Sequence, residues 1–107
     1  MSSQIKVALV TGAGTGIGRA VSIALINEGY AVVLTGRRLE LLEETASLSK
    51  ADAKDYLCVS CDVGDPDQVK HLFSELKQKY SKLDLLFNNA GVSTPKMSME
   101  DISYEQW

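Results

Sequence analysis

A glycine-rich segment near the start of the chain has the composition of a phosphate-binding turn. Residues 11–18 read Thr-Gly-Ala-Gly-Thr-Gly-Ile-Gly and directly follow the apolar run at residues 5–10. Glycine accepts positive φ and leaves backbone N–H groups open to a ligand's oxygens, and a helix that begins there adds the positive end of its dipole. The fingerprint G-x-G-x-x-G does not fit, because Ile17 and Arg19 stand where its last glycine would be. The pattern that fits is T-G-x-x-x-G-x-G.

Arginine stands where a dinucleotide would make its ribose contact. About 20 residues after the glycine-rich turn, where an NAD site places an acidic residue, the chain reads Thr35-Gly36-Arg37-Arg38. A carboxylate there would repel a 2′-phosphate, whereas Gly36 leaves room and Arg37 offers a fork of donors. These residues favour NADP over NAD. The alternative is that both arginines are merely solvated at the start of a helix.

Two further segments could border the same cofactor. Asp62 could accept from an adenine amino group while Val63 borders the ring, although an Asp that ends a strand is more often a turn or cap residue. Residues 88–91 read Asn-Asn-Ala-Gly. Their small side chains allow close approach of cofactor and backbone, and their amides can tie neighbouring strands together.

Alternating strand-like and helix-like segments position these residues. Strands are predicted at residues 5–10, 31–35, 56–61 and 83–87, and helices at 17–28, at 39–49 and from Pro66 onward. The strands are mostly unbroken apolar runs, which suit a parallel sheet covered on both faces. Right-handed crossovers then predict the strand order 3-2-1-4, with the first two helices on one face and the third on the other. The fold class is α/β, a partial Rossmann-type doubly wound parallel sheet of four strands and three helices.

The helices differ in how clearly the sequence marks their buried faces. The third has Asp65 as its cap, Pro66 at its first position and Gln68 at the capping-box spacing. Its predicted buried stripe is Val69, Leu72, Phe73, Leu76 and Tyr80, and His71 falls outside it, as a surface histidine rather than a ligand. The first helix is predicted to bury Ile17, Ala20, Val21, Ala24 and Leu25. The second is predicted to bury Leu41, Leu42, Thr45, Ala46 and Leu48.

Composition excludes several other classes of protein. The 107 residues suffice for one small domain, and a net charge of -3 supplies no positive field for nucleic acid or anionic lipid. The start has no basic region, and its apolar run is too short for a signal sequence or membrane span, so a cytoplasmic location is predicted.

Cys58 and Cys61 form C-x-x-C, but strand residues three apart face opposite sides of a sheet. This spacing favours two reduced, packed thiols over a redox pair.

Together these motifs resemble the short-chain dehydrogenase/reductase family. The matching elements are T-G-x-x-x-G-I-G at residues 11–18, the pair Asp62-Val63, and L-D-L-L-F-N-N-A-G at residues 83–91, in the family's order and spacing. The resemblance implies that Gly12, Gly16, Gly18 and the neighbouring backbone hold the pyrophosphate, and that Ile17 packs against the cofactor. It also implies that residues 88–91 line the nicotinamide side and that Arg37 marks NADP. The family's second basic mark is absent, because Thr15 stands there. The candidate cofactor-binding residues are Gly12, Gly14, Thr15, Gly16, Ile17, Gly18, Arg37, Arg38, Asp62, Val63, Asn89, Ala90 and Gly91.

The resemblance also implies an activity. It predicts the NADP(H)-binding part of an oxidoreductase that transfers a hydride between the cofactor and a small-molecule alcohol or carbonyl substrate, in an intact protein that is a homo-oligomer. The family's catalytic motif Y-x-x-x-K is absent, because no tyrosine here has a lysine four residues later. No catalytic or metal-binding residue is therefore assigned. The alternatives are a non-catalytic NADP(H)-binding sensor or interaction module on the same fold, and a bare scaffold that binds nothing.

The last residues suggest that the domain continues. Ser103 and Gln106 have the spacing of a capping box, only one residue before Trp107. A helix is unstable after a single turn, because its nucleation costs more than that turn returns. Residues 1–107 are therefore expected to be the N-terminal dinucleotide-binding part of one larger domain, truncated at the start of its next helix and inactive alone.

Overall fold

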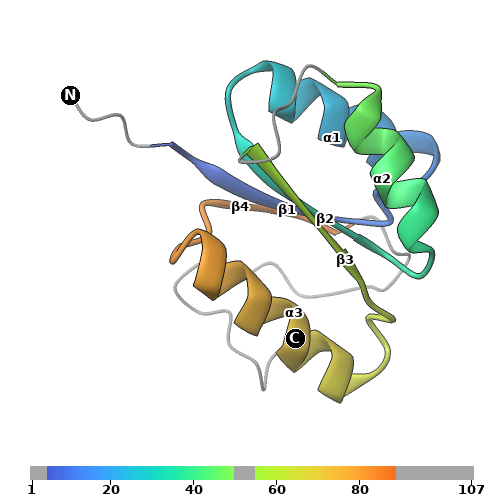
Figure 1. Ribbon diagram of the computed structural model, residues 1–107, viewed down its shortest axis with the longest axis vertical. Helices are drawn as coiled ribbons and strands as arrows, with labels where there is room; N and C mark the ends of the chain where they lie inside the picture. Colours follow the sequence, from blue (N-terminus) through green and yellow to red (C-terminus); the bar gives the residue numbers. More distant parts are fainter. Residues whose placement is uncertain (1–4, 50–54, 89–107) are drawn as a thin grey trace.

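Four parallel strands and three helices make up the regular structure of residues 5–49 and 55–88, the part of the chain that the computed structural model describes. The strand order is β3-β2-β1-β4, which confirms the predicted order 3-2-1-4. Helices α1 and α2 cover one face of the sheet and α3 covers the other (Figure 1), as right-handed crossovers require. In chain order the elements are β1 (Val7–Thr11), α1 (Gly16–Asn27), β2 (Ala31–Gly36), α2 (Leu39–Ser47), β3 (Tyr56–Ser60), α3 (Pro66–Lys79) and β4 (Leu85–Phe87).

The two central strands are buried along nearly their whole length. In β1, Val7 and Leu9 pack into the core beneath α3, whereas Ala8 and Val10 pack into the core beneath α1 and α2. The register of β1 with β2 pairs Val7 with Ala31 and continues to Thr11 with Thr35. Because both faces of these strands are covered, their sequences are unbroken apolar runs rather than alternating ones.

Helix α3 begins and packs as the sequence predicts. One carboxylate oxygen of Asp65 accepts from the backbone N–H groups of Asp67 and Gln68, at 3.0 and 3.4 Å. The side-chain oxygen of Gln68 accepts from the backbone of Asp62 at 2.8 Å, so this residue ties the helix to the loop before it. The predicted stripe is buried except for Tyr80, which packs against it partly buried, and His71 is exposed.

The predicted buried face of α1 is wrong in part. The residues that α1 buries are Gly18, Ser22 and Ile26, spaced four apart. The hydroxyl of Ser22 donates to the carbonyl of Gly18 at 2.7 Å, so its burial leaves no unpaired polar group. Two of these residues are small, which suits close packing on the sheet, and the third, Ile26, packs into the core beneath α1 and α2. Val21 and Leu25 are partly buried, and Ile17, Ala20 and Ala24 are exposed.

Helix α2 follows its prediction more closely. It buries Leu42, Thr45 and Ala46, and Leu41 is partly buried. The exception is Leu48, which caps the C-terminus of the helix and is exposed.

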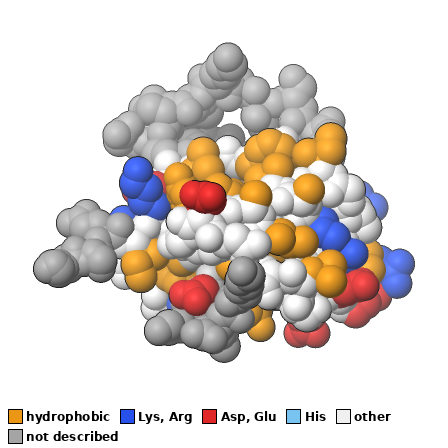
Figure 2. Space-filling view, turned by 90° about the horizontal axis from the view of Figure 1, so that it is seen from above, with side chains coloured by type: hydrophobic (Ala, Val, Ile, Leu, Met, Phe, Trp, Pro, Cys, Tyr) orange, Lys and Arg blue, Asp and Glu red, His pale blue; other side chains and the backbone are white. Residues whose placement is uncertain are grey.

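Figure 2 views the molecule from the side of α1 and α2 and shows hydrophobic side chains lying among charged ones on this surface. In the described part of the chain, no helix is long and apolar enough to cross a membrane.

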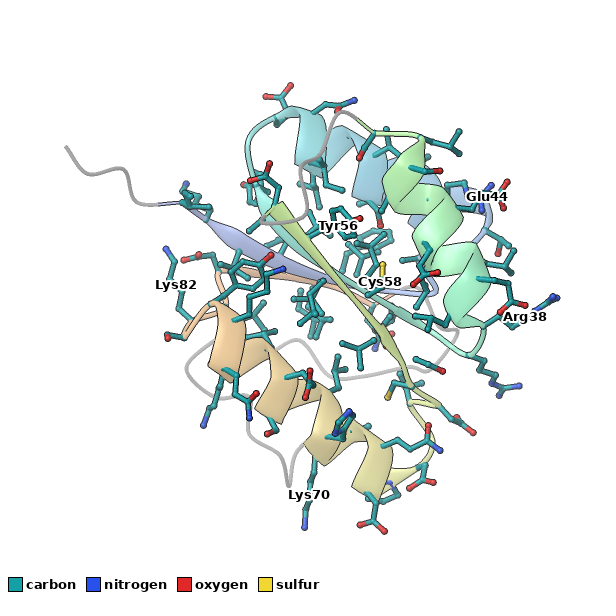
Figure 3. All side chains as sticks on the ribbon, in the orientation of Figure 1. Arg38, Glu44, Tyr56, Cys58, Lys70 and Lys82 are labelled. Atoms are coloured by element: carbon teal, nitrogen blue, oxygen red, sulfur yellow. The ribbon has the colours of Figure 1, made fainter. Side chains whose placement is uncertain are left out.

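The two cysteines lie on opposite faces of the sheet, as predicted. Cys58 packs with the core beneath α1 and α2 and points from β3 toward α2 (Figure 3), whereas Cys61 belongs to the core beneath α3. Both are free thiols. Burial raises the pKa of the Cys58 thiol to about 11 and also raises the pKa of Cys61. Both thiols are therefore protonated at neutral pH, which is the opposite of a redox dithiol.

Asp84 joins the start of β4 to the start of β1. Its carboxylate accepts from the backbone N–H of Val7 at 2.8 Å, and this hydrogen bond is the main reason that the pKa of Asp84 is lowered. Lys82 lies 3.1 Å from the same carboxylate. The stability contributed by the charged form is complete above the ordinary value of 3.8 and is lost as pH falls through the lower folded pKa.

We therefore expect Asp84→Asn to lower the free energy of unfolding at pH 7, because the amide keeps an acceptor for Val7 but loses the charge-assisted bond. The difference between the variant and the wild type is expected to shrink as pH falls below 3.8. Urea denaturation at pH 7 and at several acid pH values measures both effects. A difference that stays constant with pH would contradict this role of the carboxylate.

Candidate functional site

The predicted site residues follow the carboxyl ends of the strands, which meet along one edge of the sheet. The registers align Thr11 with Thr35 and Gly36 with Ser60, so β1, β2 and β3 end together. The helix after β1 covers one face, whereas the helix before β4 covers the other (Figure 1). In such sheets a crevice opens where the connections diverge, and ligands bind there. The glycine-rich turn after β1 lies at this point.

The glycine-rich turn has a backbone that requires glycine at two positions. Gly12 has φ 63° and Gly16 has φ 57°, in the left-handed region that other residues adopt at a cost. Gly14 is buried, and a Cβ atom added there would lie 2.8 Å from the Cβ of Leu41. The turn is thus shaped by both its backbone conformation and its contact with α2.

The N-terminus of α1 is open to solvent. Thr15 is the N-cap, in an extended conformation, and its side chain makes no capping hydrogen bond within the described residues. Thr15, Gly16 and Ile17 are exposed, whereas Gly18 is buried against the sheet. The first turn of α1 carries no acidic side chain. Backbone N–H groups at such a helix start, together with the helix dipole, form a site for an anion.

The two arginines after β2 have different surroundings. Arg37 is 80% exposed, and its guanidinium lies 4.0 Å from the carboxylate of Asp62, which follows β3. The hydroxyl of Ser60 donates to the carbonyl of Arg37 at 3.1 Å and so holds its backbone beside β3. Arg38 instead pairs with Glu40 at 2.8 Å and points away from the molecule at the start of α2 (Figure 3). Of the two arginines, only Arg37 lies beside another predicted site residue among those that the structure describes.

Asp62 and Val63 both have structural contacts. The carboxylate of Asp62 accepts from the backbone of Gly64 at 2.9 Å, which is the turn role that was the alternative interpretation. The same oxygen is the one nearest Arg37. Val63 is partly buried and packs against the core beneath α3. Both residues are at the predicted edge of the sheet, where the carboxylate of Asp62 stabilises the turn that follows β3.

The end of β4 is tied to the end of β1 by side chains. The hydroxyl of Thr11, which is fully buried, donates to the side-chain oxygen of Asn88 at 3.0 Å. This contact confirms that an amide in this segment joins neighbouring strands. Asn89, Ala90 and Gly91 lie outside the described residues, as do Ser103, Gln106 and Trp107.

A polar network that the sequence interpretation missed supports the glycine-rich turn. The hydroxyl of Thr45, on α2, lies 2.9 Å from the carbonyl of Ala13, and the Nε of Arg19 donates to that hydroxyl at 2.9 Å. A second nitrogen of Arg19 lies 3.1 Å from the carboxylate of Glu44. The sequence signal that could have revealed this network was a hydroxyl, that of Thr45, in an otherwise apolar buried face of α2.

Among residues 5–49 and 55–88, no cluster of acidic, histidine or cysteine side chains is arranged to hold a metal.

Comparison with known proteins identifies the family. The family model described as short chain dehydrogenase matches residues 6–107. The chain belongs to this family of oxidoreductases. It is 42% identical over 103 residues to a 3beta-hydroxysteroid dehydrogenase of Mediterraneibacter gnavus, a match that covers 95% of this chain and 37% of that protein.

Solved structures of family members share the fold. Glucose dehydrogenase of Caenorhabditis elegans, in its apo form, matches with a TM-score of 0.76 and 38% identity, over 82% of this chain and 38% of that one. A variant of actinorhodin polyketide ketoreductase with NADPH matches with a TM-score of 0.75 and 30% identity, over 100% of this chain and 41% of that one. The chain thus spans well under half the length of these short chain dehydrogenases.

Proposed function

We propose that this chain is the NADP(H)-binding part of an oxidoreductase that transfers a hydride between the cofactor and an alcohol or carbonyl substrate. The observation that carries the proposal is the position of Arg37, an exposed guanidinium at the end of β2 on the same sheet edge as the glycine-rich turn. In this position a 2′-phosphate would meet a fork of donors rather than a carboxylate. The related ketoreductase with NADPH supports the choice of cofactor.

Each part of the cofactor has residues that fit it. We assign the pyrophosphate to the exposed start of α1 and the backbone around it, with Ile17 packing against the cofactor. The exposed fraction of Ile17, 66%, is high for an apolar side chain, and a bound cofactor would cover it. The adenine is assigned to Asp62 and Val63, and the nicotinamide side to Asn89, Ala90 and Gly91. Gly14 shapes the turn, and Arg38, whose guanidinium pairs with Glu40, is assigned no direct contact with the 2′-phosphate.

In this proposal the residues of this chain bind and orient, and the bound cofactor supplies the hydride chemistry. The positive end of the α1 dipole would neutralise charge on the pyrophosphate. The Arg37 guanidinium would neutralise charge on the 2′-phosphate of the adenosine ribose. No acid–base group is assigned in this chain, because none of its tyrosines is followed by the family's lysine. The intact protein is proposed to carry that group elsewhere, and the 107 residues alone are expected to give no turnover.

Titration calorimetry of the intact protein with NADPH and NADH tests the proposal. NADPH is expected to bind more tightly by about ten- to a hundredfold, the effect of a charge-assisted contact of roughly 1.5 to 3 kcal/mol. The proposal would be contradicted if NADH bound more tightly than NADPH, or if neither dinucleotide bound. Oxidation of NADPH by carbonyl substrates then tests the enzyme assignment. Binding without turnover over a panel of ketosteroids, sugars and oxoacyl thioesters would indicate a non-catalytic sensor instead.

A further inference from the structure

We infer that Thr45 and Arg19 are positioning residues that orient the Ala13–Gly14 peptide of the glycine-rich turn for binding the cofactor's pyrophosphate. Neither residue belongs to the glycine-rich motif or to the predicted cofactor contacts. Thr45 contacts the turn backbone directly, at the carbonyl of Ala13, and Arg19 acts through its contact with Thr45. The inference rests on the proposed function, and it names the residues that hold the backbone of the pyrophosphate site in place.

The Ala13 residue is held from two sides. Its backbone N–H donates to the carbonyl of Thr35 on β2 at 3.1 Å. Its carbonyl lies 2.9 Å from the hydroxyl of Thr45 on α2. Across a trans peptide bond the carbonyl and the following N–H point in opposite directions. Because the Ala13 carbonyl points toward α2, the N–H of Gly14 points away from α2.

Arg19 determines where the Thr45 proton goes. A threonine inside a helix ordinarily donates to the carbonyl four residues earlier, and the carbonyl of Leu41 does lie 3.0 Å from the Thr45 hydroxyl. Arg19 donates its Nε to the Thr45 oxygen at 2.9 Å, and another of its nitrogens lies 3.4 Å from the carbonyl of Leu41. The guanidinium thus supplies a donor to Leu41 and leaves the single proton of Thr45 for Ala13.

Burial makes this arrangement specific. Thr45 is 0% exposed, so water cannot replace its hydrogen bond to Ala13 if the hydroxyl is removed. Arg19 is anchored by Glu44, 3.1 Å away, which lies on the outer side of α2 (Figure 3). The neighbouring Gly14 is packed against Leu41 of the same helix. One turn of α2 therefore holds one peptide of the turn, through a hydrogen bond and a steric contact.

The test compares two ligands that share only part of the site. NADPH carries both the pyrophosphate and the 2′-phosphate, whereas adenosine 2′-monophosphate carries the 2′-phosphate alone. In the intact protein, Thr45→Val is expected to raise the dissociation constant of NADPH by about tenfold and that of adenosine 2′-monophosphate by less than about twofold. Thr45→Ser keeps the hydroxyl and is expected to bind NADPH like the wild type. Ser47→Ala removes another hydroxyl of α2, which donates to a carbonyl of its own helix, and is the matched control.

The outcomes separate this inference from the proposed function. If wild-type protein fails to bind NADPH, the proposed function is wrong. If wild-type protein binds and Thr45→Val binds NADPH equally well, only the positioning role is wrong. Equal weakening of both ligands would mean a general loss of structure and would also overturn the role. If Thr45→Val does not fold, Arg19→Lys takes its place: it keeps the positive charge, loses the paired donors, and is expected to show the same ligand-selective loss.

Discussion

Replacing Arg37 by alanine is expected to lower the preference of the intact protein for NADPH over NADH by about ten- to a hundredfold. The expected loss falls on NADPH alone, because NADH has no 2′-phosphate for the guanidinium to meet. The side chain is 80% exposed, and its one ion pair with the described residues is a 4.0 Å contact with Asp62, so its removal should leave the fold intact. Dissociation constants from titration calorimetry with both dinucleotides measure the change.

Arg38→Ala is the matched control for this experiment. Arg38 is the next residue, is similarly exposed, and differs in that its guanidinium pairs with Glu40 at 2.8 Å. We expect its removal to change the NADPH preference by less than about threefold, since a solvated ion pair contributes little. A comparable loss in both variants, or an equal loss of NADH and NADPH binding in Arg37→Ala, would refute the specific contact between Arg37 and a 2′-phosphate.

Gly14→Ala is expected to destabilise the fold by about 1–3 kcal/mol, the usual cost of forcing atoms into a packed site. Its new Cβ would lie 2.8 Å from the Cβ of Leu41, an atom that is fixed to the α2 backbone and cannot swing aside. The turn or the helix must therefore shift, and NADPH binding is expected to weaken by at least about tenfold. Urea denaturation and calorimetric titration measure the two effects.

Two further variants serve as controls for this experiment. Leu41→Ala together with Gly14→Ala should not restore NADPH binding, because alanine keeps the Cβ atom that clashes. Ile26→Val shortens a buried side chain near the far end of α1, at a cost of about 0.5–1.5 kcal/mol. It should lower stability and leave cofactor affinity unchanged. Wild-type affinity in Gly14→Ala would show that the turn tolerates a side chain there.

Local signals were sufficient to predict much of this fold. The strands lie within two residues of their predicted ranges, because a central parallel strand must be apolar on both faces. Helix α3 was predicted with its cap because Asp65 and Gln68 act within their own turn. The face of α1 was predicted less well. Hydropathy alone favoured Ile17 and Ala24, whereas close packing on the sheet selected Gly18 and Ser22.

The sequence by itself determined the family, the strand order and the residue types along the proposed cofactor edge, because these depend on motifs and on the handedness of crossovers. Only the tertiary structure distinguished Arg37 from Arg38, since their surroundings come from β3 and α2. Only the tertiary structure brought Arg19 and Thr45 to the carbonyl of Ala13. The physical reason is distance along the chain: local spacing specifies a turn, whereas the contacts that orient its peptides come from elements that meet only after the sheet and helices have packed.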